Sequence, residues 1–381
     1  MSEYSLVIRN AQIVDGTGRT AFPGDVAVAN DRIQKVGKVS GRGRLEIDAR
    51  QQVAAPGFID IHTHYDPQLC WDRTVHPSPR HGVTSVVIGN CSVSLAPVRK
   101  GDRDKVIKWF GAVEDMESGL LAQTVSFAWE TFAEYLGELR NGGIAVNVGA
   151  FVGHALLRAY VMGDDAQRRE ATEVEINMVA DELRRSLQAG ALGLSFTYAH
   201  LDEAGQELPC MYAGRPELAV LLRVVAEAQR MVEVSVNLRA GADPFEQIEL
   251  FGALALETGA TCSLSPILVL PNPPDRWRRM LERIEAWRER GAPVFSQAQV
   301  RSMDMLVNLA NGSLVLSKTP LWRQFMEKPA AGKLEMIKDP ANRKRLADEI
   351  EHEKTIRALI EVCLVKRVKA RRNECYVGRS V

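Results

Sequence analysis

From Val53 onward, the chain alternates short apolar segments with longer amphipathic ones, and this alternation restricts the possible folds more than any other feature. The apolar segments predict strands at 57–61, 84–89, 145–151, 191–195, 232–238, 261–268 and 293–297. The amphipathic segments predict helices at 166–189, 215–230, 244–258 and 275–290. Strands that alternate with helices form a parallel sheet with right-handed crossovers, so we expect an α/β fold.

The number of predicted strands determines how such a sheet can close. A closed TIM-type (β/α)8 barrel needs eight strands, whereas this sequence offers seven candidates. Residues 303–372 have a mostly helical pattern, and nothing after them predicts an eighth strand. We therefore expect a TIM-like barrel domain at 56–381 that is incomplete at its C-terminus, with the last barrel strand missing.

Residues 1–55 have a different pattern, with short candidate strands at 6–14, 25–29, 32–36 and 44–48. Turn dipeptides such as Asp15-Gly16 and Pro23-Gly24 separate these strands. The sequence therefore predicts a small β-layer that precedes the α/β domain.

Charge and cysteine content exclude several classes of protein. Lys and Arg together number 48, as do Asp and Glu, so no net charge draws the chain to nucleic acid or to an acidic membrane. The six cysteines have no framework spacing, which indicates reduced thiols in a cytoplasmic protein. No signal peptide is evident, and no apolar stretch approaches the roughly 20 residues that cross a bilayer. We expect a cytoplasmic protein with no nucleic-acid or membrane partner.

Two histidines, His62 and His64, follow the first apolar strand of the α/β region. Side chains two residues apart on a strand project to the same side, and barrel enzymes place their sites at the C-terminal ends of their strands. Two neutral imidazoles at that position are half of a zinc-type ligand set. Cys91 follows the second strand of the region and would reach the same end of the barrel, where a thiolate is a suitable soft ligand. A lone cysteine after a strand is otherwise more typical of a small core residue.

His154 and His200 follow the third and fourth predicted strands. A histidine at such a position can orient a substrate carboxylate or carbonyl, and we expect His154 to contact substrate. The alternative for both residues is a loop histidine that satisfies backbone groups.

Five segments together resemble the amidohydrolase superfamily and, more narrowly, the N-acyl-D-amino-acid deacylase (D-aminoacylase) family. These segments are GFIDIHTHYD at 57–66, HGVTSVVIGNCS at 81–92, VNVGAFVGH at 146–154, Met162-Gly163 and AGALGLS at 189–195. The similarity extends from about residue 3 to the end of the chain, and the His-x-His and Gly-Asn-Cys motifs are its specific part.

The resemblance implies a metal-dependent hydrolase barrel and a β-sandwich built partly from residues 1–55. It also implies one or two zinc ions and hydrolysis of the C–N amide bond of an N-acylated D-amino acid, or a related small amide, by metal-activated water. By the same resemblance, His62, His64 and Cys91 would lie at the metal centre, and Tyr198 would contact the substrate.

The sequence departs from the family pattern at three places. Asn237 and Pro266 stand where the family has histidines at the ends of the fifth and sixth strands, and neither offers a good zinc ligand. The family's acid–base aspartate comes from the eighth strand, which we expect to lie beyond Val381. The catalytic residue is therefore not identified in this sequence.

Two alternatives stay open. One is a non-catalytic or inactive truncated barrel homologue, which would keep the fold without detectable deacylation. The other is a cyclic-amide hydrolase of the dihydropyrimidinase kind, which would need a carboxylated lysine at the end of the fourth strand. The sequence there is Gly193-Leu194-Ser195, which counts against this second alternative.

Overall fold

A computed structural model describes residues 3–114, 116, 118–202, 206–238, 243–269, 273–300, 309, 319–353, 357, 364–365, 368 and 371–379. Two compact units are distinguished along the chain. One comprises residues 1–59 and 77–85, and the other comprises residues 60–76 and 86–381.

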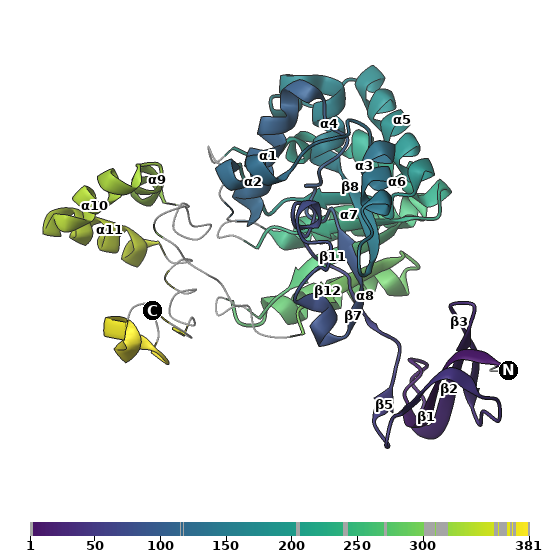
Figure 1. The fold of residues 1–381 in the computed structure, drawn as a ribbon. Coiled ribbons are helices and arrows are strands. Elements are labelled where there is room, and N and C mark those ends of the chain that lie inside the picture. The colour runs from purple at the N-terminus through teal and green to yellow at the C-terminus, as the bar shows by residue number, and fades with distance from the viewer. Residues whose placement is uncertain are drawn as a thin grey trace. The chain divides into compact units, whose positions relative to one another are not determined.

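The N-terminal unit contains a five-stranded sheet, in agreement with the candidate strands in residues 1–55. Its strands are β1 (Tyr4–Ile13), β2 (Phe22–Ala29), β3 (Arg32–Gly37), β4 (Gly43–Asp48) and β5 (Val53–Ala54). The order is β3-β2-β1-β4, with β5 also paired to β1 (Figure 1). Small apolar side chains form its core, in two clusters that include Val7, Ala27 and Val39 in one and Ala11 and Ile13 in the other.

The second sheet has seven strands in the described part of the chain, in the order β12-β11-β10-β9-β8-β7-β6. These are β6 (Phe58–Asp60), β7 (Val83–Ile88), β8 (Asn147–Gly153), β9 (Gly193–Thr197), β10 (Met231–Ser235), β11 (Thr261–Ile267) and β12 (Val294–Ala298). The pairings from β8 to β12 are parallel. All seven predicted strands are present, and the predicted α/β fold is confirmed.

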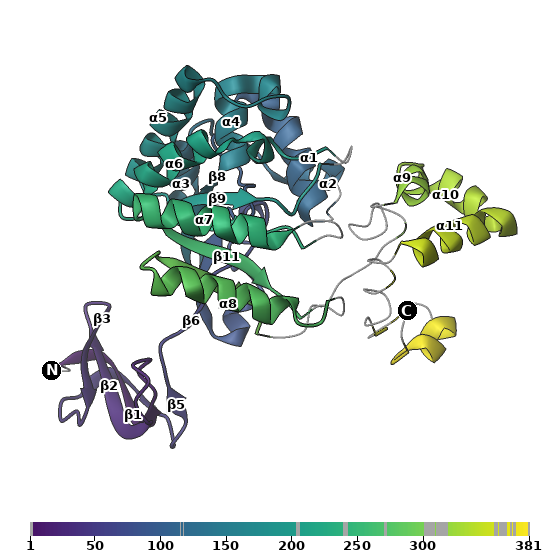
Figure 2. The same ribbon diagram turned by 180° about the vertical axis from the view of Figure 1, so that it is seen from behind.

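Helices connect successive strands and pack against the sheet. They include α4 (His154–Met162), α5 (Glu173–Ala189), α6 (Arg215–Glu227), α7 (Pro244–Thr258) and α8 (Arg276–Glu289). Figure 2 shows α7 and α8 running alongside β11. Their apolar faces are buried, for example at Leu183, Leu222 and Phe251, because each helix repeats apolar residues at three- and four-residue intervals.

The helix predicted at 166–189 begins later than expected, at Glu173. Thr172 accepts a hydrogen bond from the Glu175 backbone, and the Glu175 side chain accepts one from the Thr172 backbone, which is a capping box. This pair defines the first turn, and the residues before it form a separate short 3-10 helix at Gly163–Gln167.

Three helices between β7 and β8 were not predicted from the sequence: α1 (Arg103–Glu114), α2 (Ser118–Thr124) and α3 (Phe132–Asn141). The helical pattern expected at 303–372 is confirmed for α9 (Pro320–Met326), α10 (Ala330–Lys338) and α11 (Pro340–His352). Phe325, Met326 and Leu346 form the core of that helical group. Residues 303–308, 310–318 and most of 354–372 lie outside the described residues, and the missing eighth strand stays a prediction.

None of the helices in the described ranges combines the length and the apolar composition that spanning a bilayer requires. The described cysteines are free thiols.

Candidate metal centre

The candidate site is built on the segments that follow β6 and β7. His62 and His64 follow β6, and Cys91 follows β7 through Gly89 and Asn90. The Thr63 backbone N–H and hydroxyl both donate to the Val87 carbonyl, at 3.0 and 2.7 Å, so these bonds hold the two segments together.

The structure brings the three predicted ligands together. The ligand atoms of His62, His64 and Cys91 all lie within 4.8 Å of one another. His62 Nε2 is 3.3 Å from Cys91 Sγ, and the two imidazole rings meet edge to face with centroids 5.3 Å apart. This spacing allows one ion to contact all three side chains.

The orientation of His62 is set by its other ring nitrogen. His62 Nδ1 lies 2.9 Å from Gln297 Oε1, while Gln297 Nε2 donates to Ser263 Oγ at 2.9 Å. Because an amide oxygen only accepts, His62 carries its proton on Nδ1. Its Nε2 lone pair therefore points toward Cys91, and such outer hydrogen bonds commonly fix metal-binding histidines.

His64 is largely buried, and burial lowers its pKa well below the ordinary value, with His62 and His200 adding to the effect. It is therefore a neutral imidazole near pH 7, as a metal ligand must be. Its Nδ1 lies 3.3 Å from Glu114 Oε1, yet no hydrogen bond of acceptable geometry satisfies that nitrogen among the described residues.

Cys91 is 4% exposed, and burial, followed by the nearby Glu233 carboxylate, raises the pKa of its thiol well above the usual value. Its Sγ is 3.0 Å from Ser235 Oγ. Two nitrogen donors and one sulfur donor, converging from two segments, are a ligand set that suits zinc, and a bound cation would favour the thiolate. The residues present therefore fit a zinc-type ion.

Three acidic residues surround this cluster, and none was predicted from the sequence. Burial raises the pKa of Asp66 to about 7, and burial together with Asp66 raises that of Glu114 to about 8. Glu114 ends helix α1, which the sequence pattern did not reveal. Glu233 is fully buried in β10, and a charged residue within an otherwise apolar strand was the one signal that pointed to it.

The structure places His154 in a buried ion-pair network. It is the first residue of α4 and is fully buried, and its Nε2 is 2.8 Å from Glu217 Oε1. Glu217 also pairs with Arg158. Burial lowers the pKa of His154 despite this carboxylate. A role for His154 in substrate contact stays a prediction.

Tyr198 follows β9 and packs its ring against Phe196 and Phe251, with centroids 4.8 and 6.3 Å away. Burial raises the pKa of its phenol, so it is a neutral hydrogen-bonding group near pH 7. Its substrate contact also stays a prediction. Near it in sequence, His200 contributes to the electrostatic environment of His64, which associates it with the cluster.

Asn237 and Pro266, which stand where the resembled family has histidines, belong to the segments of the neighbouring strands β10 and β11. Asn237 follows β10, and its backbone N–H donates to Gln247 Oε1 at 2.7 Å. Pro266 is within β11. Neither provides a ring nitrogen to the site.

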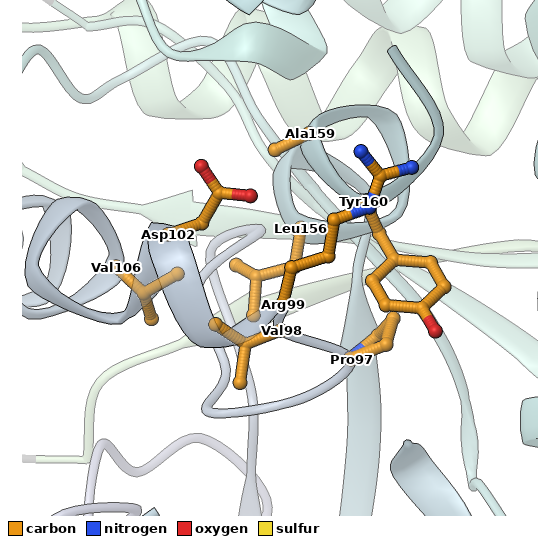
Figure 3. A pocket seen from close by; sticks show the side chains of 8 residues that line it. All are labelled: Pro97, Val98, Arg99, Asp102, Val106, Leu156, Ala159 and Tyr160. Atoms are coloured by element: carbon orange, nitrogen blue, oxygen red, sulfur yellow. The ribbon is translucent and has the colours of Figure 1, made fainter. Parts of the chain in front are cut away.

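A shallow pocket lies between α4 and the segment leading into α1 (Figure 3). It has an empty volume of about 180 Å³, part of which is open to solvent, and is lined by residues that include Pro97, Leu156 and Tyr160. Arg99 lies over the Tyr160 ring at 5.5 Å. Small-molecule sites usually enclose about 300 Å³ or more. This pocket is therefore a poor candidate for the substrate site.

Comparison with known proteins relates this chain to a group of enzymes. The sequence profile described as "Amidohydrolase family" matches residues 45–347. The chain is similar to the D-aminoacylase of Alcaligenes xylosoxydans xylosoxydans, with 36% identity over 193 residues, 50% of this chain and 37% of that protein. An N-acyl-D-aspartate deacylase from the same organism is 37% identical over 195 residues, 51% of this chain and 36% of that protein.

Solved structures give a consistent result. A D-aminoacylase studied for its binuclear metal centre aligns with a TM-score of 0.65 and 30% identity, over 77% of this chain and 58% of that one. The N-acyl-D-glutamate deacylase of Bordetella bronchiseptica, complexed with zinc and a phosphonate inhibitor, aligns with a TM-score of 0.62 and 30% identity over the same shares. In each of these four comparisons the chain spans less than two thirds of its relative.

Proposed function

Because this chain belongs to the amidohydrolase family, we propose that it is a metal-dependent hydrolase that cleaves the amide bond of an N-acylated D-amino acid. The observation that carries the proposal is the cluster of His62, His64 and Cys91, whose ligand atoms lie within 4.8 Å of one another. The relatives named D-aminoacylase, N-acyl-D-aspartate deacylase and N-acyl-D-glutamate deacylase support the substrate class.

We propose zinc as the metal and His62, His64 and Cys91 as its ligands. Bound there, zinc would lower the pKa of a water molecule to near neutrality and polarise the amide carbonyl. The chain's own residues orient the ligands. Gln297 fixes the ring of His62. Asp66 Oδ2 accepts the Gly89 N–H at 3.1 Å and so ties down the loop that carries Cys91.

The finer architecture is part of this proposal. Strands β6 to β12 would be seven strands of a TIM-like barrel within a domain at 56–381. Residues 1–55 would be part of a β-sandwich. A dihydropyrimidinase-type site is less well supported, because Ser195 in β9 donates its hydroxyl to the Gly89 carbonyl where that mechanism would need a carboxylated lysine.

Paired enantiomers test this function. Zinc-loaded protein is incubated with N-acetyl-D-amino acids, including the D-aspartate and D-glutamate derivatives, and release of the free amino acid is measured against the L-enantiomers. Zinc-dependent release from the D-enantiomers only, lost in the His62→Ala/His64→Ala variant, would support the proposal. Stoichiometric zinc without turnover would favour the inactive homologue, and failure to bind zinc would refute the metal centre.

A further inference from the structure

The loop that carries Cys91 has an unusual backbone. Gly89, Cys91 and Ser92 have φ values of 73°, 54° and 66°, in the left-handed region. Glycine adopts this region readily, but for Cys91 and Ser92 it is energetically unfavourable, and such conformations persist only where surrounding groups hold them. The position of the Cys91 sulfur therefore depends on what holds this loop.

Side chains from neighbouring strands hold the loop through its backbone N–H groups. The Cys91 N–H donates to Glu233 Oε2 at 3.0 Å, and the Ser92 N–H donates to Ser195 Oγ at 3.1 Å. Ser195 and Glu233 are themselves paired in register between β9 and β10. The two bonds therefore anchor consecutive residues of the loop to one row across the sheet.

Glu233 also reaches the side chain of Cys91 through a serine. Its Oε1 accepts hydrogen bonds from the hydroxyls of Ser235, at 3.1 Å, and Ser265, at 2.7 Å. Ser235 Oγ is in turn 3.0 Å from Cys91 Sγ. A single carboxylate thus acts on Cys91 twice, directly at the backbone and through Ser235 at the sulfur.

Burial of the Glu233 carboxylate is energetically unfavourable unless hydrogen bonds compensate for the lost water. Its side chain is fully buried in β10, between Val232 and Val234. A buried carboxylate is tolerated only when hydrogen-bond donors satisfy it, and here one N–H and two hydroxyls do so. Its Oε1 is 3.8 Å from His62 Nδ1, which places it beside a second proposed ligand.

We propose that Glu233 is the positioning residue of the metal centre, which holds Cys91 in its left-handed conformation and aims the sulfur at the position between His62 and His64. This inference rests on the proposed metal site. In this proposal Glu233 contacts neither the metal nor the substrate. It acts by positioning the sulfur of Cys91.

Cobalt spectroscopy tests the inference in the full chain. A thiolate bound to Co²⁺ gives a charge-transfer band in the near ultraviolet, which reports the Cys91–metal bond directly. We expect Glu233→Ala to lose most of this band at saturating Co²⁺ and to bind zinc about 10–100-fold more weakly, a common cost of losing an outer hydrogen-bond partner. Glu233→Gln keeps an acceptor for the Cys91 N–H and should recover part of both signals.

Glu182→Gln is the matched control, because Glu182 is also buried but pairs with Arg185 on α5, at 2.7 Å. It should keep the wild-type band and the wild-type zinc affinity. A Glu233→Ala protein that also keeps both would overturn the positioning role.

Alkylation separates failure of this inference from failure of the metal centre. Iodoacetamide labelling without metal, followed by peptide mass spectrometry, should modify Cys91 at least tenfold faster in Glu233→Ala than in wild type. Cys262 is fully buried in β11 and is the internal control for general unfolding. If wild-type protein shows no cobalt band, the metal centre is refuted, and the alkylation ratio of Cys91 to Cys262 still decides the role of Glu233. An unchanged ratio would show that Glu233 does not hold the loop.

Discussion

His62 Nδ1 and Gln297 Oε1 lie 2.9 Å apart, although 235 positions separate the two residues in sequence. His62 follows β6 and Gln297 belongs to β12, the strands at opposite ends of the seven-stranded order. A single hydrogen bond can join these two edges only if the sheet curves round on itself. The bond therefore links the curvature of the sheet to the orientation of a proposed metal ligand.

Removing the Gln297 acceptor should weaken metal binding. In Gln297→Leu, His62 loses the group that keeps its proton on Nδ1, so we expect about a tenfold loss of zinc affinity in competition titrations with a chelating dye. Gln297→Glu keeps an acceptor and should lose less. Equal zinc affinity in the leucine variant and in wild type would show that Gln297 does not orient His62.

Removing both motif histidines should abolish stoichiometric zinc. His62→Ala/His64→Ala leaves Cys91 as the one donor of the three-residue cluster, and one protein ligand does not hold zinc tightly. The measurement is metal content after dialysis, with exposed His81→Ala as the control. Wild-type zinc content in the double variant would place the metal elsewhere.

The buried ion pair on α4 and α6 should contribute to stability. Glu217 contacts both Arg158 and His154, and all three side chains are essentially fully buried. Glu217→Ala leaves the Arg158 guanidinium without its carboxylate, which typically costs about 3–5 kcal/mol. Urea unfolding followed by circular dichroism measures the loss. Glu182→Gln removes a carboxylate that pairs with a largely exposed arginine, so this variant should lose far less stability.

The capping box of α5 should make stability depend on pH. Hydrogen bonds from Arg169 and from the Thr172 backbone lower the pKa of Glu175 from 4.5 to about 2. A carboxylate whose folded pKa is depressed stabilises the protein above its unfolded pKa, and this contribution is lost as pH falls from about 4.5 to about 2.

We therefore expect the wild type to be more stable than Glu175→Gln at pH 6, and the difference to shrink by pH 3. Chemical unfolding at both pH values measures it. Glu173→Gln, in the same first turn but outside the capping box, should show a smaller change. A difference that does not depend on pH would show that the Glu175 charge is not involved.

The strands and the three proposed ligands were predictable because their signals are local. Apolar runs bounded by turn residues locate β7 and β10 to within a few residues, and the spacing of His62 and His64 is a property of one strand end. To predict that Cys91 lies near His62 and His64 required one further inference, because it depends on β6 and β7 being neighbours. A sequence that alternates strands and helices implies that adjacency.

The supporting residues were not predictable in the same way. Glu233 and Gln297 meet Cys91 and His62 across 142 and 235 positions, so their partners depend on register and curvature. The N-terminal boundary of α5 was misplaced because residues 166–172 contain no Gly or Pro to mark a break, and the Thr172–Glu175 pair sets the true start. Helix α1 was missed, and with it the acidic neighbour of His64.

The bond between His62 and Gln297 also bears on how the protein acquires its metal. Because partners of the site come from β6 through β12, a peptide with only β6 and β7 would carry the three proposed ligands but would lack Glu233 and Gln297, which hold Cys91 and His62. Metal binding is then thermodynamically linked to folding of the whole sheet. Zinc should raise the melting temperature in proportion to the logarithm of its free concentration, because it binds the folded protein in preference to the unfolded chain.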